Sequence, residues 1–236
     1  MLEAVLFDWG ETLVHWEWSD EVLEAGHAAG LRALGRRPVQ SLTATFTERY
    51  LPLLEAPGTL EEIGYEGIVS RMLAEAGIDA DHADVRRFIE AEHETWFPQH
   101  HLDSTTHALL ETLRGRGLKL GIVSNAFDPP DLLRRDLDRL GITARIDAAV
   151  FASEVRARKP DAAIFQAALD ALAVDAARTL FVGDSLEVDL AGAAALGMHT
   201  CQALWFRADE SDGTSEPDFR AFTQMDVVTA VGRLRT

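Results

Sequence analysis

Four short segments, each followed directly by polar turn residues or by a predicted helix, constrain the fold of this chain more than any other feature. In order, they are Val5-Leu6-Phe7 before Asp8, Leu120-Gly121-Ile122-Val123 before Ser124-Asn125, Arg158-Lys159-Pro160-Asp161 before a predicted helix, and Leu180-Phe181-Val182 before Gly183-Asp184-Ser185. A short apolar run bounded by turn residues is typical of a buried strand. Ligands of open α/β sheets bind beyond the carboxyl ends of such strands, so these breaks are places for chemistry.

From about residue 104, β-rich runs alternate with helical patterns. Strands are predicted over 118–123, 146–151, 178–183 and 198–203, and helices over 131–140, 161–173 and 187–196. This is the rhythm of βαβ units in a doubly wound parallel sheet, so the predicted class is α/β. Asp8, Ser124 and Asp184 each follow a strand, and we expect them to converge at one edge of the sheet.

Residues 18–97 have a different sequence pattern, because their apolar residues recur at helical spacing without strand-like alternation. Four helices are predicted there, inserted between the first strand and the rest of the sheet. We therefore expect an α/β core made of residues 1–14 and 101–236, with an all-helical cap over 15–100.

Composition narrows the classes of partner. The net charge is −17, from 39 acidic and 22 basic residues without a basic cluster, which argues against nucleic acid. The negative electrostatic field of such a chain slows the approach of an anionic substrate unless a metal ion makes the potential positive at the binding site. Cys201 is the only cysteine, so no intramolecular disulfide is expected. With no run near the ~20 apolar residues of a membrane helix, we expect a cytoplasmic protein without a membrane partner.

The motifs FDWGETL, VSN, KPD and GDSLEVD, read in this order, resemble the four motifs of the haloacid dehalogenase-like (HAD) hydrolases. The resemblance covers the core by motif and the cap by position and helical character. It implies a Rossmann-like core with an inserted cap. It also implies a hydrolase that is most often a phosphatase of small phosphorylated metabolites, working through an aspartyl-phosphate as a monomer or homodimer.

Two groups of carboxylates carry the predicted chemistry. Asp8 is the candidate nucleophile, since an unperturbed Asp has a pKa of ~3.9 and needs no base to activate it. Asp184 and Asp189 offer the hard oxygen ligands that Mg²⁺ prefers, although capping of a helix is an alternative role for both. The resemblance implies that Asp8, the carbonyl of Gly10 and Asp184 bind Mg²⁺ directly and that Asp189 holds a bound water.

Ser124, Asn125 and Lys159 are the predicted phosphoryl-binding residues. Ser124 and Asn125 offer a hydroxyl and an amide at the crevice, and the resemblance implies a hydrogen bond from Ser124 to the phosphoryl group; a plain helix cap is the alternative. Lys159 is one of only two lysines in the chain. Its compact ammonium is suited to stabilise charge on phosphoryl oxygens.

One position departs from the family pattern. The phosphatases carry a second Asp two residues after the nucleophile, which acts as acid and base, and here Gly10 takes its place. Three explanations are open: Glu11 supplies the group, His15 supplies it, or the substrate has a leaving group that needs little protonation. Haloacid dehalogenases also lack that Asp, so a 2-haloacid dehalogenase is the alternative enzyme. A catalytically weak protein that binds phosphate esters is the alternative outside catalysis.

Overall fold

The computed structural model describes residues 1–55, 59–207 and 213–235. They form two compact units. The core unit comprises Met1–Trp16, His101–Asn125 and Leu137–Thr236, and the helical unit comprises Glu17–His100 and Ala126–Asp136. In this division the segment Ala126–Asp136 packs with the helical unit, although it follows a strand of the core unit in the chain.

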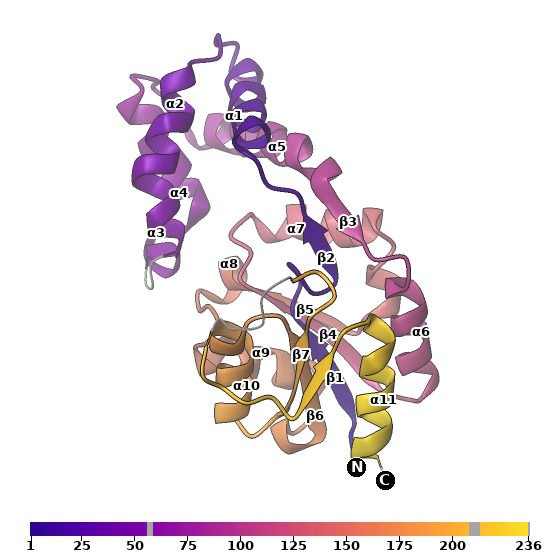
Figure 1. The fold of residues 1–236 in the computed structure, drawn as a ribbon. Coiled ribbons are helices and arrows are strands. Elements are labelled where there is room, and N and C mark those ends of the chain that lie inside the picture. Colours follow the sequence, from indigo (N-terminus) through magenta and orange to yellow (C-terminus); the bar gives the residue numbers. More distant parts are fainter. Residues whose placement is uncertain (56–58, 208–212, 236) are drawn as a thin grey trace. The chain divides into compact units, whose positions relative to one another are not determined.

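Within the described residues, six strands of the core unit form one parallel sheet (Figure 1). Its order is β5 (Ala148–Phe151), β4 (Lys119–Ser124), β1 (Ala4–Phe7), β6 (Thr179–Gly183), β7 (His199–Ala203) and β8 (Phe219–Ala221). The central strand β1 is buried throughout, and its last residue, Phe7, pairs with Ile122 of β4 and Val182 of β6. The predicted α/β class with a doubly wound parallel sheet is confirmed.

Helices cover both faces of this sheet. They are α6 (Thr106–Gly115), α8 (Ala152–Val155), α9 (Ala162–Leu172), α10 (Ala191–Ala195) and α11 (Gln224–Leu234). Most of α7 (Pro130–Arg139) belongs to the helical unit instead. Figure 1 shows α6 and α11 on one side of the sheet and α9 and α10 on the other. Helix α9 is typical: Asp161 caps its first turn by accepting from the Ala163 amide, and its apolar face packs on the sheet, with Phe165 and Phe181 in an edge contact.

The helical unit contains α1 (Asp20–Ala33), α2 (Gln40–Thr45), α3 (Leu51–Glu55), α4 (Thr59–Glu75) and α5 (His82–Trp96). Two glycines of α1 let α1 and α5 approach closely. A Cβ at Gly26 would lie 2.3 Å from the Trp96 indole nitrogen, and one at Gly30 would lie 2.5 Å from the Phe88 ring. The Trp96 indole N–H also donates to the Val22 carbonyl at 3.2 Å, so sequence-distant helices form one packed layer.

Two buried histidines of the helical unit both lie beside carboxylates, but their pKa values are shifted in opposite directions. His93 lies between two carboxylates, with Nδ1 2.9 Å from Asp128 and Nε2 2.8 Å from Asp136. Burial by itself lowers the pKa of His93, but these two carboxylates raise it to about 10. His27 Nδ1 lies 2.9 Å from the Thr43 hydroxyl and Nε2 lies 3.3 Å from Glu92 Oε1. Burial raises the pKa of Glu92 well above its ordinary value and lowers the pKa of His27 to about 4. The surroundings of His93 therefore favour its charged form and those of His27 its neutral form.

Two short strands, β2 (Val14–Trp16) and β3 (His100–Leu102), pair as a separate two-stranded sheet. Strands of three residues are too short to show an alternating pattern in the sequence, and neither is predicted above. No helix among the described residues has the length and apolar character needed to cross a membrane.

Candidate functional site

Asp8 is fixed at the end of the central strand. Its amide donates to the Val182 carbonyl at 2.8 Å, which extends the pairing of β1 with β6 by one residue. A tight turn follows, in which the Trp9 carbonyl accepts from the amides of both Leu13 and Val14 at 3.0 Å. The Asp8 side chain is 10% exposed. A buried carboxylate is thus held rigidly at the carboxyl edge of the sheet, as the sequence predicts.

The turn after β6 carries the other two carboxylates. Ser185 caps the following helical turn by accepting from the Val188 amide at 3.0 Å, and its own amide donates to Asp189 Oδ2 at 3.1 Å. A Cβ at Gly183 would lie 2.6 Å from the carboxylate of Asp189. Glycine at this position therefore leaves the space that the Asp189 side chain occupies.

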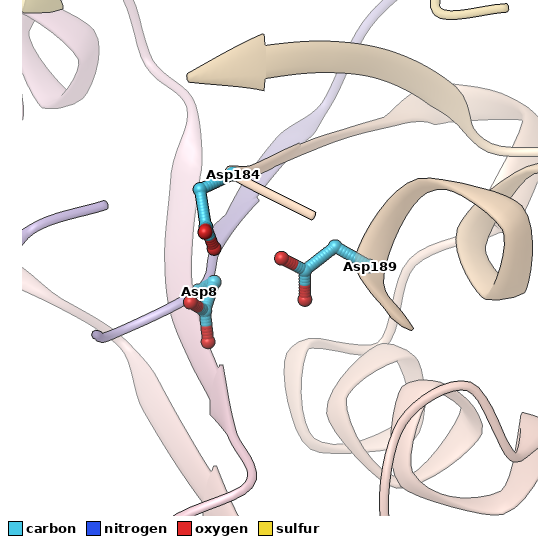
Figure 2. A group of neighbouring side chains, drawn as sticks. All are labelled: Asp8, Asp184 and Asp189. Atoms are coloured by element: carbon cyan, nitrogen blue, oxygen red, sulfur yellow. The ribbon is translucent and has the colours of Figure 1, made fainter. Parts of the chain in front are cut away.

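Asp8, Asp184 and Asp189 meet at this edge. Each offers a carboxylate oxygen, and these oxygens all lie within 4.8 Å of one another. Figure 2 shows the three side chains close together, with Asp189 on the helical turn that follows Asp184. Residues 176 positions apart in the sequence, Asp8 and Asp184, are brought together because β1 and β6 are neighbours in the sheet.

Lys159 joins the cluster as a buried cation. Its Nζ forms an ion pair with Asp8 Oδ1 and lies 2.7 Å from Asp189 Oδ1, and its side chain is 3% exposed. Asn125 holds the main chain at this point. Asn125 Oδ1 accepts from the Lys159 amide at 2.7 Å, and Asn125 Nδ2 donates to the Lys159 carbonyl at 3.1 Å. Asn125 therefore positions Lys159 through both ends of its amide.

The electrostatics of this cluster are strongly perturbed. Burial raises the pKa of Asp8 to about 7; the charge of Asp189 adds to the rise, and Lys159 opposes it. Burial also raises the pKa of Asp184 to about 8, together with the charges of Asp8 and Asp189. Despite its burial, Lys159 has a pKa raised above its ordinary value by the charges of Asp189 and Asp8. A cation bound among these carboxylates would lower the pKa values of Asp8 and Asp184.

This donor set fits a hard divalent cation. It consists of carboxylate oxygens alone, which suits Mg²⁺ and other cations that prefer oxygen over nitrogen or sulfur. A cation among them would offset both the burial and the mutual repulsion that raise the pKa values of Asp8 and Asp184. Gly10 lies in the turn just after Asp8 and forms a bridge with Val14, so its carbonyl stays a predicted ligand.

Arg207 is a member of the site that the sequence reading missed. Its Nη1 donates to Asp184 Oδ2 at 3.1 Å and to the Asp184 carbonyl at 3.2 Å. The residue follows β7, whose carboxyl end lies at the same edge of the sheet as those of β1 and β6. Its position shortly after a predicted strand is the signal that could have found it.

The remaining predicted residues fall into two places. Ser124 is the last residue of β4 and is buried, next to Asn125 and hence to the Lys159 main chain. Glu11 and His15 contact each other in the turn and strand after Asp8: His15 Nδ1 lies 2.9 Å from Glu11 Oε2. No hydrogen bond or ion pair between this pair and the three aspartates is recorded among the described residues.

Comparison with known proteins agrees with this geometry. The model of a hydrolase family, the haloacid dehalogenase-like hydrolases, matches residues 2–197. A search of curated proteins found no match to the sequence. Solved structures share the fold. A HAD phosphatase from Thermococcus onnurineus is 24% identical, with a TM-score of 0.67 and 98% of each chain covered.

Two further structures widen the comparison. A 2-haloacid dehalogenase from Pseudomonas syringae pv. tomato DC3000 is 24% identical, with a TM-score of 0.71, covering 99% of this chain and 100% of its own. The protein YfnB from Bacillus subtilis, in a structure bound to magnesium, is 17% identical, with a TM-score of 0.65 and 98% of each chain covered. The family match spans most of the chain and includes all three clustered aspartates, and so this protein belongs to the haloacid dehalogenase-like hydrolases.

Proposed function

We propose that this protein is a Mg²⁺-dependent phosphatase of small phosphorylated metabolites, with Asp8 as the nucleophile. The observation that carries the proposal is the meeting of two buried carboxylates, Asp8 and Asp189, and the partly buried Asp184 with a buried lysine at the carboxyl edge of the sheet. A carboxylate that attacks phosphorus needs neighbouring cations, because both it and the phosphoryl oxygens are negative. Lys159 and a divalent cation would supply that charge.

Each residue has a part in this mechanism. Asp8 attacks phosphorus, the bond to the leaving oxygen breaks, and an aspartyl-phosphate forms; water then attacks the same phosphorus and releases Asp8 and phosphate. Mg²⁺, held by Asp8, Asp184, Asp189 and the Gly10 carbonyl, would neutralise the charge of the phosphoryl oxygens. Lys159 stabilises the same charge from its fixed position.

Ser124 and Asn125 complete the proposed phosphoryl site. The Ser124 hydroxyl, at the carboxyl end of β4, would donate to a phosphoryl oxygen. Asn125 contributes through Lys159, because both ends of its amide bind the Lys159 main chain. A lysine placed in this way loses little conformational entropy when the substrate binds.

A 2-haloacid dehalogenase is the second candidate. Gly10 favours it, since no carboxylate stands at that position to protonate a leaving alkoxide, and a halide leaves without a proton. Similarity of fold to a 2-haloacid dehalogenase is in keeping with this candidate. In that reaction Asp8 would attack carbon, and Mg²⁺ would not be needed.

A single set of assays separates the candidates. Phosphate release from p-nitrophenyl phosphate and acetyl phosphate is measured with Mg²⁺ and with EDTA, and halide release from a 2-haloacid is measured alongside. We expect Mg²⁺-dependent phosphate release that is lost in Asp8→Asn. Metal-independent halide release would identify a dehalogenase instead. Tight binding of phosphate esters without turnover in either assay would identify a binding protein.

A further inference from the structure

Glu11 has an unusual backbone conformation three residues after Asp8. Its φ angle is +54°, in the left-handed region that residues with a side chain rarely adopt. The side chain makes two contacts: Glu11 Oε2 lies 2.9 Å from His15 Nδ1, and Glu11 Oε1 accepts from the Trp16 amide at 3.2 Å. A conformation that costs free energy is thus accompanied by an ordered carboxylate–histidine pair.

The contact with Glu11 fixes the role of each imidazole nitrogen. A carboxylate at Nδ1 favours a proton on that nitrogen, so Nε2 is the nitrogen that exchanges a proton with other groups. The His15 side chain is 40% exposed, so a substrate or a water molecule can reach it. This arrangement, a carboxylate that orients an accessible imidazole, is suited to acid–base catalysis.

Three consecutive residues after β7 connect this pair to the aspartates. The Trp205 indole N–H donates to the Thr12 carbonyl at 2.8 Å. The Phe206 ring stacks on His15 with 5.4 Å between ring centroids and 29° between planes. Arg207 binds Asp184. One short segment therefore contacts the turn after Asp8, the His15 imidazole and Asp184 of the carboxylate cluster.

The reaction needs a proton that the cluster itself does not supply. An alkoxide is a poor leaving group, so the leaving oxygen of an alkyl phosphate must be protonated as its bond to phosphorus breaks. Asp8 is the nucleophile, and Asp184 and Asp189 belong to the metal site. Lys159 holds its proton tightly between two carboxylates. Gly10 has no side chain to offer.

We propose that His15 is the catalytic acid and base of this enzyme and that Glu11 is its positioning residue. This inference rests on the proposed phosphatase function. In the first step the His15 imidazolium gives its Nε2 proton to the leaving oxygen while Asp8 bonds to phosphorus and the leaving bond breaks. In the second step neutral His15 takes a proton from water, the water oxygen bonds to phosphorus, and the bond from phosphorus to Asp8 breaks.

The test compares leaving groups. p-Nitrophenolate leaves without protonation, whereas an alkoxide does not, so loss of the acid should affect the two substrates differently. In His15→Gln we expect kcat/KM to fall about 10²–10⁴-fold for a primary alkyl phosphate and less than about 10-fold for p-nitrophenyl phosphate. Glu11→Ala should lower the ratio of kcat/KM for the alkyl phosphate to kcat/KM for p-nitrophenyl phosphate, as His15→Gln does. A variant that combines Glu11→Ala with His15→Gln should have the same ratio as His15→Gln alone, because Glu11 acts through His15.

His199 provides a matched control. It is also 40% exposed and also faces a carboxylate, Asp218, but it begins β7 and so lies at the opposite end of that strand from the site. His199→Gln should keep the wild-type ratio of alkyl to aryl rates. Thermal unfolding of each variant shows whether the fold is retained.

Two results would overturn the inference. If His15→Gln turns over p-nitrophenyl phosphate but keeps the wild-type ratio of alkyl to aryl rates, His15 is not the acid, and the phosphatase proposal stands. If the wild type releases no phosphate from either ester, the phosphatase proposal is wrong, and this inference, which rests on it, is wrong as well. A partial rescue of alkyl phosphate turnover in His15→Ala by added imidazole would support the inference directly.

Discussion

Replacing His93 with glutamine should change how the stability of the helical unit depends on pH. In the folded protein His93 is a buried cation between Asp128 and Asp136, and its pKa is about 10 rather than 6.5. The folded state therefore binds a proton that the unfolded chain releases between these two values. The stabilisation is fully present below pH 6.5 and is lost as the pH rises through about 10.

The size of the effect follows from the two pKa values. Each tenfold difference in proton affinity corresponds to about 1.36 kcal/mol, so the complete loss is on the order of 5 kcal/mol. Between pH 7 and 9 the free energy of unfolding of the wild type should fall by roughly 2–3 kcal/mol relative to that of His93→Gln. This is a large part of the stability of a typical domain.

The assay is urea unfolding at a series of pH values, followed by tryptophan fluorescence. Trp18 and Trp96 lie in the helical unit and pack edge to face at 5.7 Å between ring centroids, so they report its unfolding. At each pH the free energy of unfolding of the variant is subtracted from that of the wild type, which removes the contributions of titratable groups that both proteins share. A difference that stays constant from pH 7 to 9 would show that His93 is not a cation in the folded protein.

His27 provides the contrasting case within the same unit. Burial lowers its pKa to about 4, so the folded state holds it neutral while the unfolded chain takes up a proton below pH 6.5. Stability should therefore fall as the pH drops from 6.5 toward 4, by up to about 3 kcal/mol, and His27→Gln should remove this acid-side loss. A loss at low pH that is the same in His27→Gln and wild type would contradict this assignment.

Three further predictions concern the active site. Gly10→Asp should raise the rate on alkyl phosphates more than on aryl phosphates, because nothing lies within 4 Å of a Cβ built there and the new carboxylate can act as an acid; equal rates in variant and wild type would point to an existing acid. Gly183→Ala should weaken Mg²⁺ binding measured by calorimetry, since its methyl group would displace Asp189, and wild-type affinity would refute this. Lys159→Met should lower kcat for p-nitrophenyl phosphate by about 10²–10³-fold with a smaller change in KM, and a change confined to KM would exclude a role in the transition state.

The sequence was most informative where burial and chain direction control the structure. Apolar runs ending at Asp8 and at Gly183 predict two buried strands, and β1 and β6 occupy those positions as neighbours in the sheet. The predicted strand 118–123 corresponds to β4, and the predicted helix 161–173 to α9. These elements bury continuous apolar surface, so their apolar residues follow the spacing of a buried strand or of one helix face, which can be recognised in the sequence.

The spacing of apolar and polar residues along the sequence does not predict the contacts of long polar side chains. Arg207 binds Asp184, and His93 binds two carboxylates of the segment that follows β4, but no spacing along the chain encodes either partner. The left-handed conformation of Glu11 was equally hidden, because it depends on contacts with His15 and the Trp16 amide. The roles assigned from the resemblance to Ser124 and the Gly10 carbonyl stay predictions.

The most direct test of the central claim is to look for the phosphoryl group on Asp8. The protein is mixed with acetyl phosphate and Mg²⁺, quenched in acid within the first turnover, digested and examined by mass spectrometry. We predict a phosphoryl adduct on the peptide that contains Asp8, and its absence in Asp8→Asn and in protein treated with EDTA. Phosphate release in that variant at the wild-type rate, or an adduct on another residue, would contradict nucleophilic catalysis by Asp8.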